Sequence, residues 1–95
     1  MKYDELPVYR LTYSLVTQVV SFVKNFPKDY KFTLGDKIKD ECFTAITLIY
    51  RANSNMNNRK ESIENCLERI KVVEMLLRLS GDLQIISTKQ YSEAI

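Results

Sequence analysis

The sequence has no histidine, no tryptophan and only two cysteines among its 95 residues. Without histidine, His-containing zinc sites and Cys–His nucleophile pairs are excluded. Cys42 and Cys66 are too far apart in the sequence to form a Cys-x-x-Cys motif, and we expect both to be buried core thiols, as free cysteines usually are. A disulfide between them stays open as an alternative, although it fits a reducing compartment poorly. We expect neither a metal nor a cofactor.

Glycine and proline are also scarce, at two residues each. So few helix breakers favour long uninterrupted helices and an all-α fold. No apolar run approaches the 18 or so residues that a membrane span needs, and Met1 to Arg10 mixes charges instead of forming a signal peptide. The sequence therefore predicts a cytoplasmic protein without a membrane partner, built as a single domain over residues 1–95.

Apolar residues recur at steps of three and four, which predicts helices over Pro7–Asn25, Leu34–Ala52 and Arg59–Ile86. Pro27 has no backbone N–H and disfavours helical geometry in the residue before it, so the first helix has to stop ahead of it. Thr33 is expected to cap the second helix with its hydroxyl group. Four asparagines between residues 53 and 58 predict a turn before the third helix.

The first and third helices carry more apolar surface than one bundle seam requires. We expect the first helix to turn one face inward and to carry a second apolar stripe beside it. The inward face comprises Val8, Leu11, Thr12, Leu15, Val19, Phe22 and Phe26, and the second stripe comprises Tyr9, Tyr13, Val16, Val20 and Val23.

A capping-box pattern at Ser87-Thr-Lys-Gln90 predicts a fourth helix that begins at Thr88. Only about eight residues remain, too few to be stable unless the helix docks on the others. The predicted fold is an antiparallel, up-and-down four-helix bundle with a short or truncated fourth helix.

Positive charge gathers between the first two predicted helices. Residues 24–39 hold five lysines and two aspartates, a net +3, whereas the whole chain carries +2. Such a cluster suits an anionic partner, but a solvated lysine-rich loop explains it as well.

Four ordered motifs carry a resemblance to a known family. They are Phe26-Pro-Lys28, Phe32-Thr-Leu-Gly35, Leu76-Leu-Arg-Leu79 with Asp82-Leu83, and Ser87-Thr-Lys-Gln-Tyr91. In this order they resemble the accessory variability determinant (Avd) proteins of diversity-generating retroelements. That family lies within a superfamily of four-helix bundles that includes proteins encoded in ribosomal-RNA intervening sequences.

The resemblance implies a non-enzymatic accessory protein that forms a homopentamer and binds nucleic acid and the reverse transcriptase in support of mutagenic retrohoming. Five copies of a +2 chain would carry +10, a stronger field for RNA or DNA than one copy provides. The candidate contacts to nucleic-acid phosphates or to a partner are Lys28, Lys31, Lys37, Lys39, Arg69, Lys71 and Arg78.

Two other classes of function stay open. A protein-only helical scaffold would use the apolar stripes for partner helices and the lysines for solubility, and an intervening-sequence-encoded protein would have an unknown role. An enzyme is disfavoured, because Glu61, Glu64 and Glu68 share a helical face but lack the Glu-x-x-His partner of di-iron bundles. No P-loop or dinucleotide-binding fingerprint is present.

Overall fold

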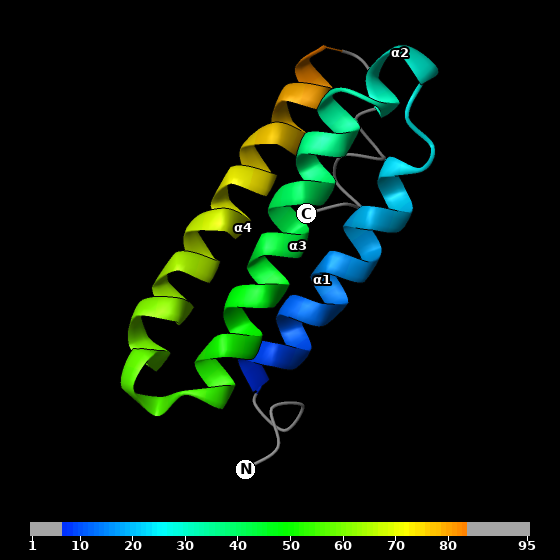
Figure 1. The fold of residues 1–95 in the computed structure, drawn as a ribbon. Helices are drawn as coiled ribbons and strands as arrows, with labels where there is room; N and C mark the ends of the chain where they lie inside the picture. The colour runs from blue at the N-terminus through cyan, green and yellow to red at the C-terminus, as the bar shows by residue number, and fades with distance from the viewer. Residues whose placement is uncertain (1–6, 84–95) are drawn as a thin grey trace.

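The computed structural model describes residues 7–83, which form a bundle measuring 42 × 19 × 17 Å. Its long helices are α1 (Pro7–Val23), α3 (Leu34–Ser54) and α4 (Arg59–Asp82). Two short elements join them, α2 (Lys28–Lys31) and the 3-10 helix η2 (Met56–Asn58). Figure 1 shows the three long helices side by side, with α3 between α1 and α4, α2 at one end of the bundle and η2 at the other.

The prediction of an all-α fold is confirmed for the described residues, and so are three predicted long helices, although their ends differ. Helix α1 stops two residues before Asn25, and α3 continues two residues beyond Ala52. Helix α4 ends at Asp82, four residues before the predicted end at Ile86. Its last two residues, Gly81 and Asp82, are both weak helix formers, which favours an end here. The fourth helix expected from Thr88 lies outside the described residues.

The joint between α1 and α3 contains a short helix that the sequence did not predict. As expected, α1 stops before Pro27, and the Phe26 N–H donates to the Val23 carbonyl at 3.0 Å. The carbonyl of Pro27 then accepts from the N–H groups of Tyr30 and Lys31, both at 2.9 Å, and these bonds form α2. Four residues are too few to display a helical period in the sequence.

The expected hydroxyl cap at Thr33 is wrong. Thr33 precedes α3, but its side chain makes no capping hydrogen bond there. Its hydroxyl donates instead to the Asp29 carbonyl of α2, at 3.3 Å. The last carbonyls of a helix lack partners within that helix, so α2 offers Thr33 a competing acceptor.

Gly35 allows the first turn of α3 to approach the end of α1. It is buried, and a β-carbon at this position would lie 2.9 Å from Val23 Cγ1 and 3.3 Å from the Tyr30 carbonyl oxygen. Both distances are shorter than ordinary van der Waals contact. The joint is therefore closely packed at Gly35.

The core consists of two clusters of buried side chains. The cluster nearer the joint draws on α1, α3 and α4, and the cluster nearer η2 is built mainly from small side chains of α3 with one thiol of α4. The first comprises Val19, Val23, Phe26, Ile38, Cys42, Val73 and Leu77, and the second comprises Ala45, Ile49, Ala52 and Cys66.

The two cysteines are free and buried, as predicted, and they belong to different clusters. The disulfide alternative is not what the structure contains. Burial, assisted by the negative charge of Glu41, raises the pKa of Cys42 to about 11. Burial also raises the pKa of Cys66, and a hydrogen bond with Thr12 opposes that rise. Thiolates are therefore scarce at neutral pH, and neither side chain suits nucleophilic catalysis.

The expected inward face of α1 is wrong at one position. Leu11 leaves 72% of its surface exposed, whereas the neighbouring Thr12 is only 2% exposed. Because Thr12 shares a hydrogen bond with Cys66, its hydroxyl group is satisfied inside the bundle. Thr12, which was also expected on this face, is therefore buried there, while Leu11 is not.

At the other end, Asn55 shapes the turn into α4. Its side-chain oxygen accepts from the Asn57 N–H at 3.0 Å, while its own N–H donates to the Arg51 carbonyl at 3.1 Å. The predicted asparagine-rich turn is confirmed, with its first two residues still belonging to α3.

Candidate binding surfaces

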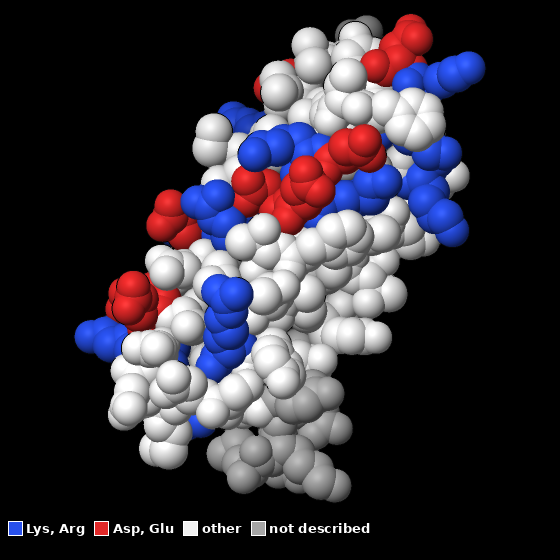
Figure 2. All heavy atoms as spheres, viewed as in Figure 1, with Lys and Arg blue, Asp and Glu red and all other residues white. Residues whose placement is uncertain are grey.

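Four of the seven candidate cations lie at the end of the bundle formed by the α1–α3 joint. Lys28 and Lys31 belong to α2, and Lys37 and Lys39 to the first two turns of α3. In the space-filling view, basic and acidic side chains mix across the half of the face that contains this joint, while the other half is mostly uncharged (Figure 2). The joint is thus positive overall but not uniformly so.

Two of these lysines have acidic neighbours on the same helix. Lys37 Nζ lies 3.1 Å from Glu41 Oε1, and Lys39 Nζ lies 3.1 Å from Asp36 Oδ1. The Lys39–Asp36 pair is partly exposed on both sides, so it contributes little to stability and exchanges readily with other partners, whereas Lys37 pairs with a carboxylate whose side chain is only 8% exposed. Both lysines therefore stay accessible to an anionic ligand, at the cost of releasing a carboxylate.

Arg69, also predicted as a contact, forms two ion pairs. Its guanidinium group bridges two helices, with Nη1 3.0 Å from Glu41 Oε2 on α3 and Nη2 3.0 Å from Glu68 Oε1 on α4. Glu41 is only 6% exposed. A buried carboxylate needs such a partner, so Arg69 neutralises charge within the fold.

The sequence reasoning missed Glu41, although a signal was present. Glu41 follows Ile38 by three residues and precedes Ala45 by four, which places it on the buried face of α3. A carboxylate at such a position requires a cation from a neighbouring helix, and Arg69 supplies it.

The last two candidates, Lys71 and Arg78, lie on α4. Both are exposed, and within residues 7–83 neither forms an ion pair. Seven residues separate them, close to two helical turns, so they point to the same side of α4. The candidates therefore fall into a joint cluster, a part-buried bridge at Arg69 and a pair on one side of α4.

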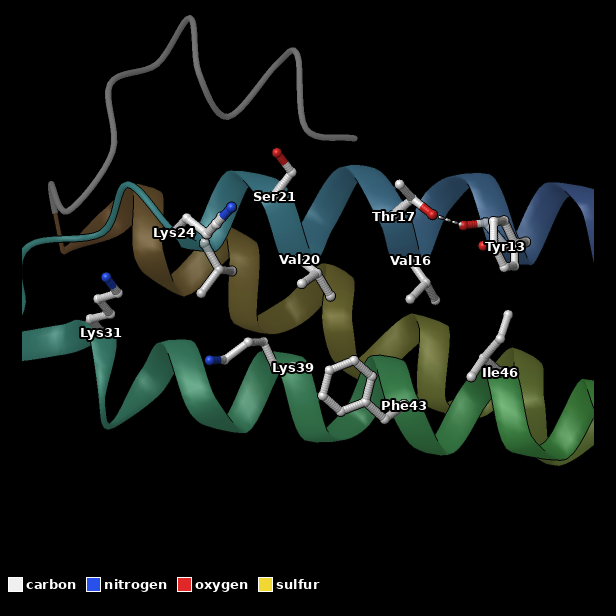
Figure 3. A pocket seen from close by; sticks show the side chains of 11 residues that line it. Tyr13, Val16, Thr17, Val20, Ser21, Lys24, Lys31, Lys39, Phe43 and Ile46 are labelled. Atoms are coloured by element: carbon white, nitrogen blue, oxygen red, sulfur yellow. Dashed lines mark hydrogen bonds between the residues drawn. The ribbon is translucent and has the colours of Figure 1, made fainter.

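A hollow lies between α1 and α3, beside two of the candidate cations, and we call it the α1–α3 groove. It has a volume of about 640 Å³ and is open to solvent along one side. In Figure 3, Val16 and Val20 project from α1 towards α3, while Phe43 and Ile46 project from α3 towards α1. Its lining residues are Tyr13, Val16, Thr17, Val20, Ser21, Val23, Lys24, Lys31, Lys39, Phe43 and Ile46.

Three lysines close one end of this groove. Lys24 follows the end of α1, Lys31 comes from α2 and Lys39 from α3, and Figure 3 shows them together at the end nearer the joint. Lys24 was counted in the positive excess of the sequence but was not among the predicted contacts. Its position could not be inferred, because only the bend at Pro27 folds α2 back to place Lys31 near it.

Residues 7–83 contain neither a metal-binding cluster nor a membrane-spanning helix. Among residues 7–83, no group of three or more Cys, Asp and Glu side chains is arranged to hold a metal ion. None of the helices in that range has both the length and the apolar character needed to cross a membrane.

Comparison with known proteins gives one match. A family model described as bAvd-like matches residues 8–95, which is nearly the whole chain. No curated protein and no solved structure matches significantly. The match includes the joint, the α1–α3 groove and the whole of α3 and α4.

Proposed function

This chain belongs to the bAvd-like family, and we propose that it is a non-enzymatic accessory protein of a diversity-generating retroelement. The family is in general accessory and non-catalytic. In this proposal the protein works in the cytoplasm, where it binds template RNA or its cDNA and holds it near the reverse transcriptase. The family match is the observation that carries the proposal, because it extends across 88 of the 95 residues.

The lysines of the joint support binding to nucleic acid. Lys24, Lys28, Lys31, Lys37 and Lys39 come from three successive segments and lie at one end of the bundle. A cluster of this kind attracts phosphates without reading bases, so we expect binding with little sequence preference. Lys71 and Arg78 would extend this surface along α4, whereas Arg69 would act indirectly, by fixing α4 against α3.

Exposed apolar side chains on α4 support a homo-oligomer, which the family resemblance suggests is a pentamer. Met75, Leu79 and Leu83 follow one another at four-residue steps and are 71%, 43% and 50% exposed. Side chains at this spacing form one stripe on a helix. Burying the stripe against another copy would remove it from water and would multiply the positive charge of the assembly.

Filter binding with single-stranded RNA tests the nucleic-acid role. We expect affinity to fall steeply as salt rises, because bound phosphates release counterions. Replacing both α2 lysines (Lys28→Glu and Lys31→Glu) should weaken binding at least about tenfold and flatten the salt dependence. Lys60→Glu is the matched control, since Lys60 is exposed at the start of α4, at the opposite end of the bundle. Absence of salt-dependent binding by the wild-type protein would refute this role.

A protein-only scaffold is the second candidate, and the ion pairs favour it. Lys37, Lys39 and Arg69 are each already paired with a carboxylate, which lowers the net field available to phosphates. This alternative predicts that the purified protein captures the reverse transcriptase but shows no salt-dependent RNA binding. Light scattering of the same preparation tests the oligomer, and a monomer at micromolar concentration would refute the pentamer.

A further inference from the structure

We propose that the α1–α3 groove is a docking site for an amphipathic α-helix of a protein partner, one that carries carboxylates in its first turn. The inference rests on the proposed function only in that the protein acts on a protein partner. It goes beyond that function by naming where such a partner binds and what chemistry its segment has. The groove and its lysine end carry the argument.

The shape of the groove suits a helix. Tyr13 to Val23 spans ten residue steps of α1, or about 15 Å, which is nearly three turns of a docked helix. Val16 and Val20 on α1 and Ile46 on α3 are each half-buried, so they still have apolar surface to offer. Such a trough between two helices receives the apolar ridge of a third helix, with anchors three and four residues apart.

Two aromatic residues stand at the margin of the groove. Tyr13 on α1 is 55% exposed and Phe43 on α3 is 50% exposed. Exposed rings of this size bury a large apolar area when a partner covers them, and aromatic residues often dominate binding energy. Both rings would gain contacts along the sides of a docked helix.

The charges fix the polarity of the occupant. Lys24, Lys31 and Lys39 gather at one end, and no carboxylate from residues 7–83 lines the groove. Among the described residues, Lys24 and Lys31 form no ion pair, and the Asp36 partner of Lys39 is itself 48% exposed on its side chain. Carboxylates complement these lysines. A helix accommodates carboxylates best in its first turn, where they interact favourably with the positive end of the helix dipole.

Nucleic acid fits this groove less well than a helix does. Beyond the lysine end, the lining is dominated by aliphatic and aromatic side chains, with hydroxyl groups at Thr17 and Ser21. The Thr17 hydroxyl already donates to the Tyr13 carbonyl at 2.8 Å. A phosphate backbone laid along this surface would lose water without gaining enough hydrogen bonds in return.

A synthetic peptide tests the proposal. The probe is a fluorescein-labelled helix of about four turns with leucines at i, i+3, i+4 and i+7 and glutamates at the three positions of its first turn. The matched probe replaces the three glutamates by glutamine. We expect fluorescence anisotropy with the full-length protein to show at least about tenfold tighter binding of the glutamate peptide, with the difference shrinking as salt rises.

Variants of the protein locate the binding. Lys24→Glu and Phe43→Ala should each weaken binding of the glutamate peptide by about tenfold, since one removes charge complementarity and the other an aromatic contact. Lys60→Glu, at the other end of the bundle, should leave it unchanged. Single-stranded RNA that binds the joint should compete with the glutamate end of the peptide, because both ligands would use Lys24, Lys31 and Lys39.

Several outcomes would overturn the proposal. Equal affinity for the glutamate and glutamine peptides, no binding of either, or indifference to both Lys24→Glu and Phe43→Ala would do so. Dissociation of an oligomer by Phe43→Ala would show that a second copy fills the groove, and saturable binding of decanoate alone would assign it to a small amphiphile. Peptide binding and filter binding to RNA are measured independently. Failure of the nucleic-acid role would therefore not overturn the docking site, and failure of the docking site would not overturn the nucleic-acid role.

Discussion

The two sides of α3 differ in how completely they are packed. Towards α4, the cluster near η2 is sealed, with Ala45, Ile49, Ala52 and Cys66 all 0% exposed and with Val8 and Tyr9 of α1 packed against it. The Glu41–Arg69 bridge adds a charged contact between α3 and α4. Towards α1, α3 makes buried contacts through the joint cluster, but the α1–α3 groove beside that cluster is open to solvent. This contrast indicates that the α3–α4 contact carries much of the stability while the outer edge between α1 and α3 stays available for binding.

Ile49→Ala provides the strongest test of this contrast. Ile49 is fully buried, so losing its side-chain carbons and leaving a cavity should lower the free energy of unfolding by about 3 kcal/mol. The matched substitution Ile46→Ala removes the same atoms from the half-buried lining of the α1–α3 groove and should cost about 1 kcal/mol. Urea denaturation followed by circular dichroism measures both, and equal losses would contradict the contrast.

Arg69→Ala tests the charged part of the α3–α4 contact. It leaves Glu41 nearly buried with only the exposed Lys37 as a partner, which should cost about 2 kcal/mol. Removing both charges with Arg69→Met and Glu41→Leu should recover most of that loss, because neither variant side chain requires a partner.

The measurement for this pair is a double-mutant cycle in urea. Lys71→Ala is the control on α4, as Lys71 is exposed, and it should change the free energy of unfolding by less than about 0.5 kcal/mol. A double variant as unstable as Arg69→Ala would mean that the bridge matters through packing and not through neutralisation of Glu41.

Gly35→Ala tests the close approach that holds α1 against α3 at the joint. The added methyl group would gain up to about 1 kcal/mol of helix propensity but would clash with Val23 and the Tyr30 carbonyl. Overpacking should win, leaving a net loss of about 1 kcal/mol. In a Val23→Ala background the nearest clash is absent, so Gly35→Ala should there be neutral or stabilising. Equal destabilisation in both backgrounds would locate the strain at the Tyr30 carbonyl instead.

The sequence predicted the long helices because their signals are local. Three- and four-residue apolar steps, the stop at Pro27 and the asparagine-rich turn before α4 all act within a few residues, and the structure follows them. It did not predict α2, which is too short for periodicity, and it misplaced the hydroxyl of Thr33, because the competing acceptor on Asp29 exists only once α2 has formed.

The candidate site was harder to predict because it depends on contacts between helices. The lysine excess of the joint was visible in the sequence, but the pairing of Arg69 with Glu41 joins residues 28 positions apart. The α1–α3 groove depends on how far apart two helices lie along their outer edge, and no local pattern encodes that separation. Only the surplus apolar stripe of α1, which includes Tyr13, Val16 and Val20, indicated that one face would lack a partner.

The smallest effect on stability should come from changing the margin of the α1–α3 groove. Phe43→Ala and Lys24→Glu alter exposed side chains, so each should change the free energy of unfolding by less than about 0.5 kcal/mol while weakening peptide binding. Fluorescence-monitored urea denaturation of each variant, beside wild type and Lys60→Glu, checks this. A loss above about 1 kcal/mol would show that these residues support the fold, and the two sides of α3 would then differ less than their packing indicates. Unchanged stability together with lost binding would separate the part of α3 that holds the bundle from the part that binds a partner.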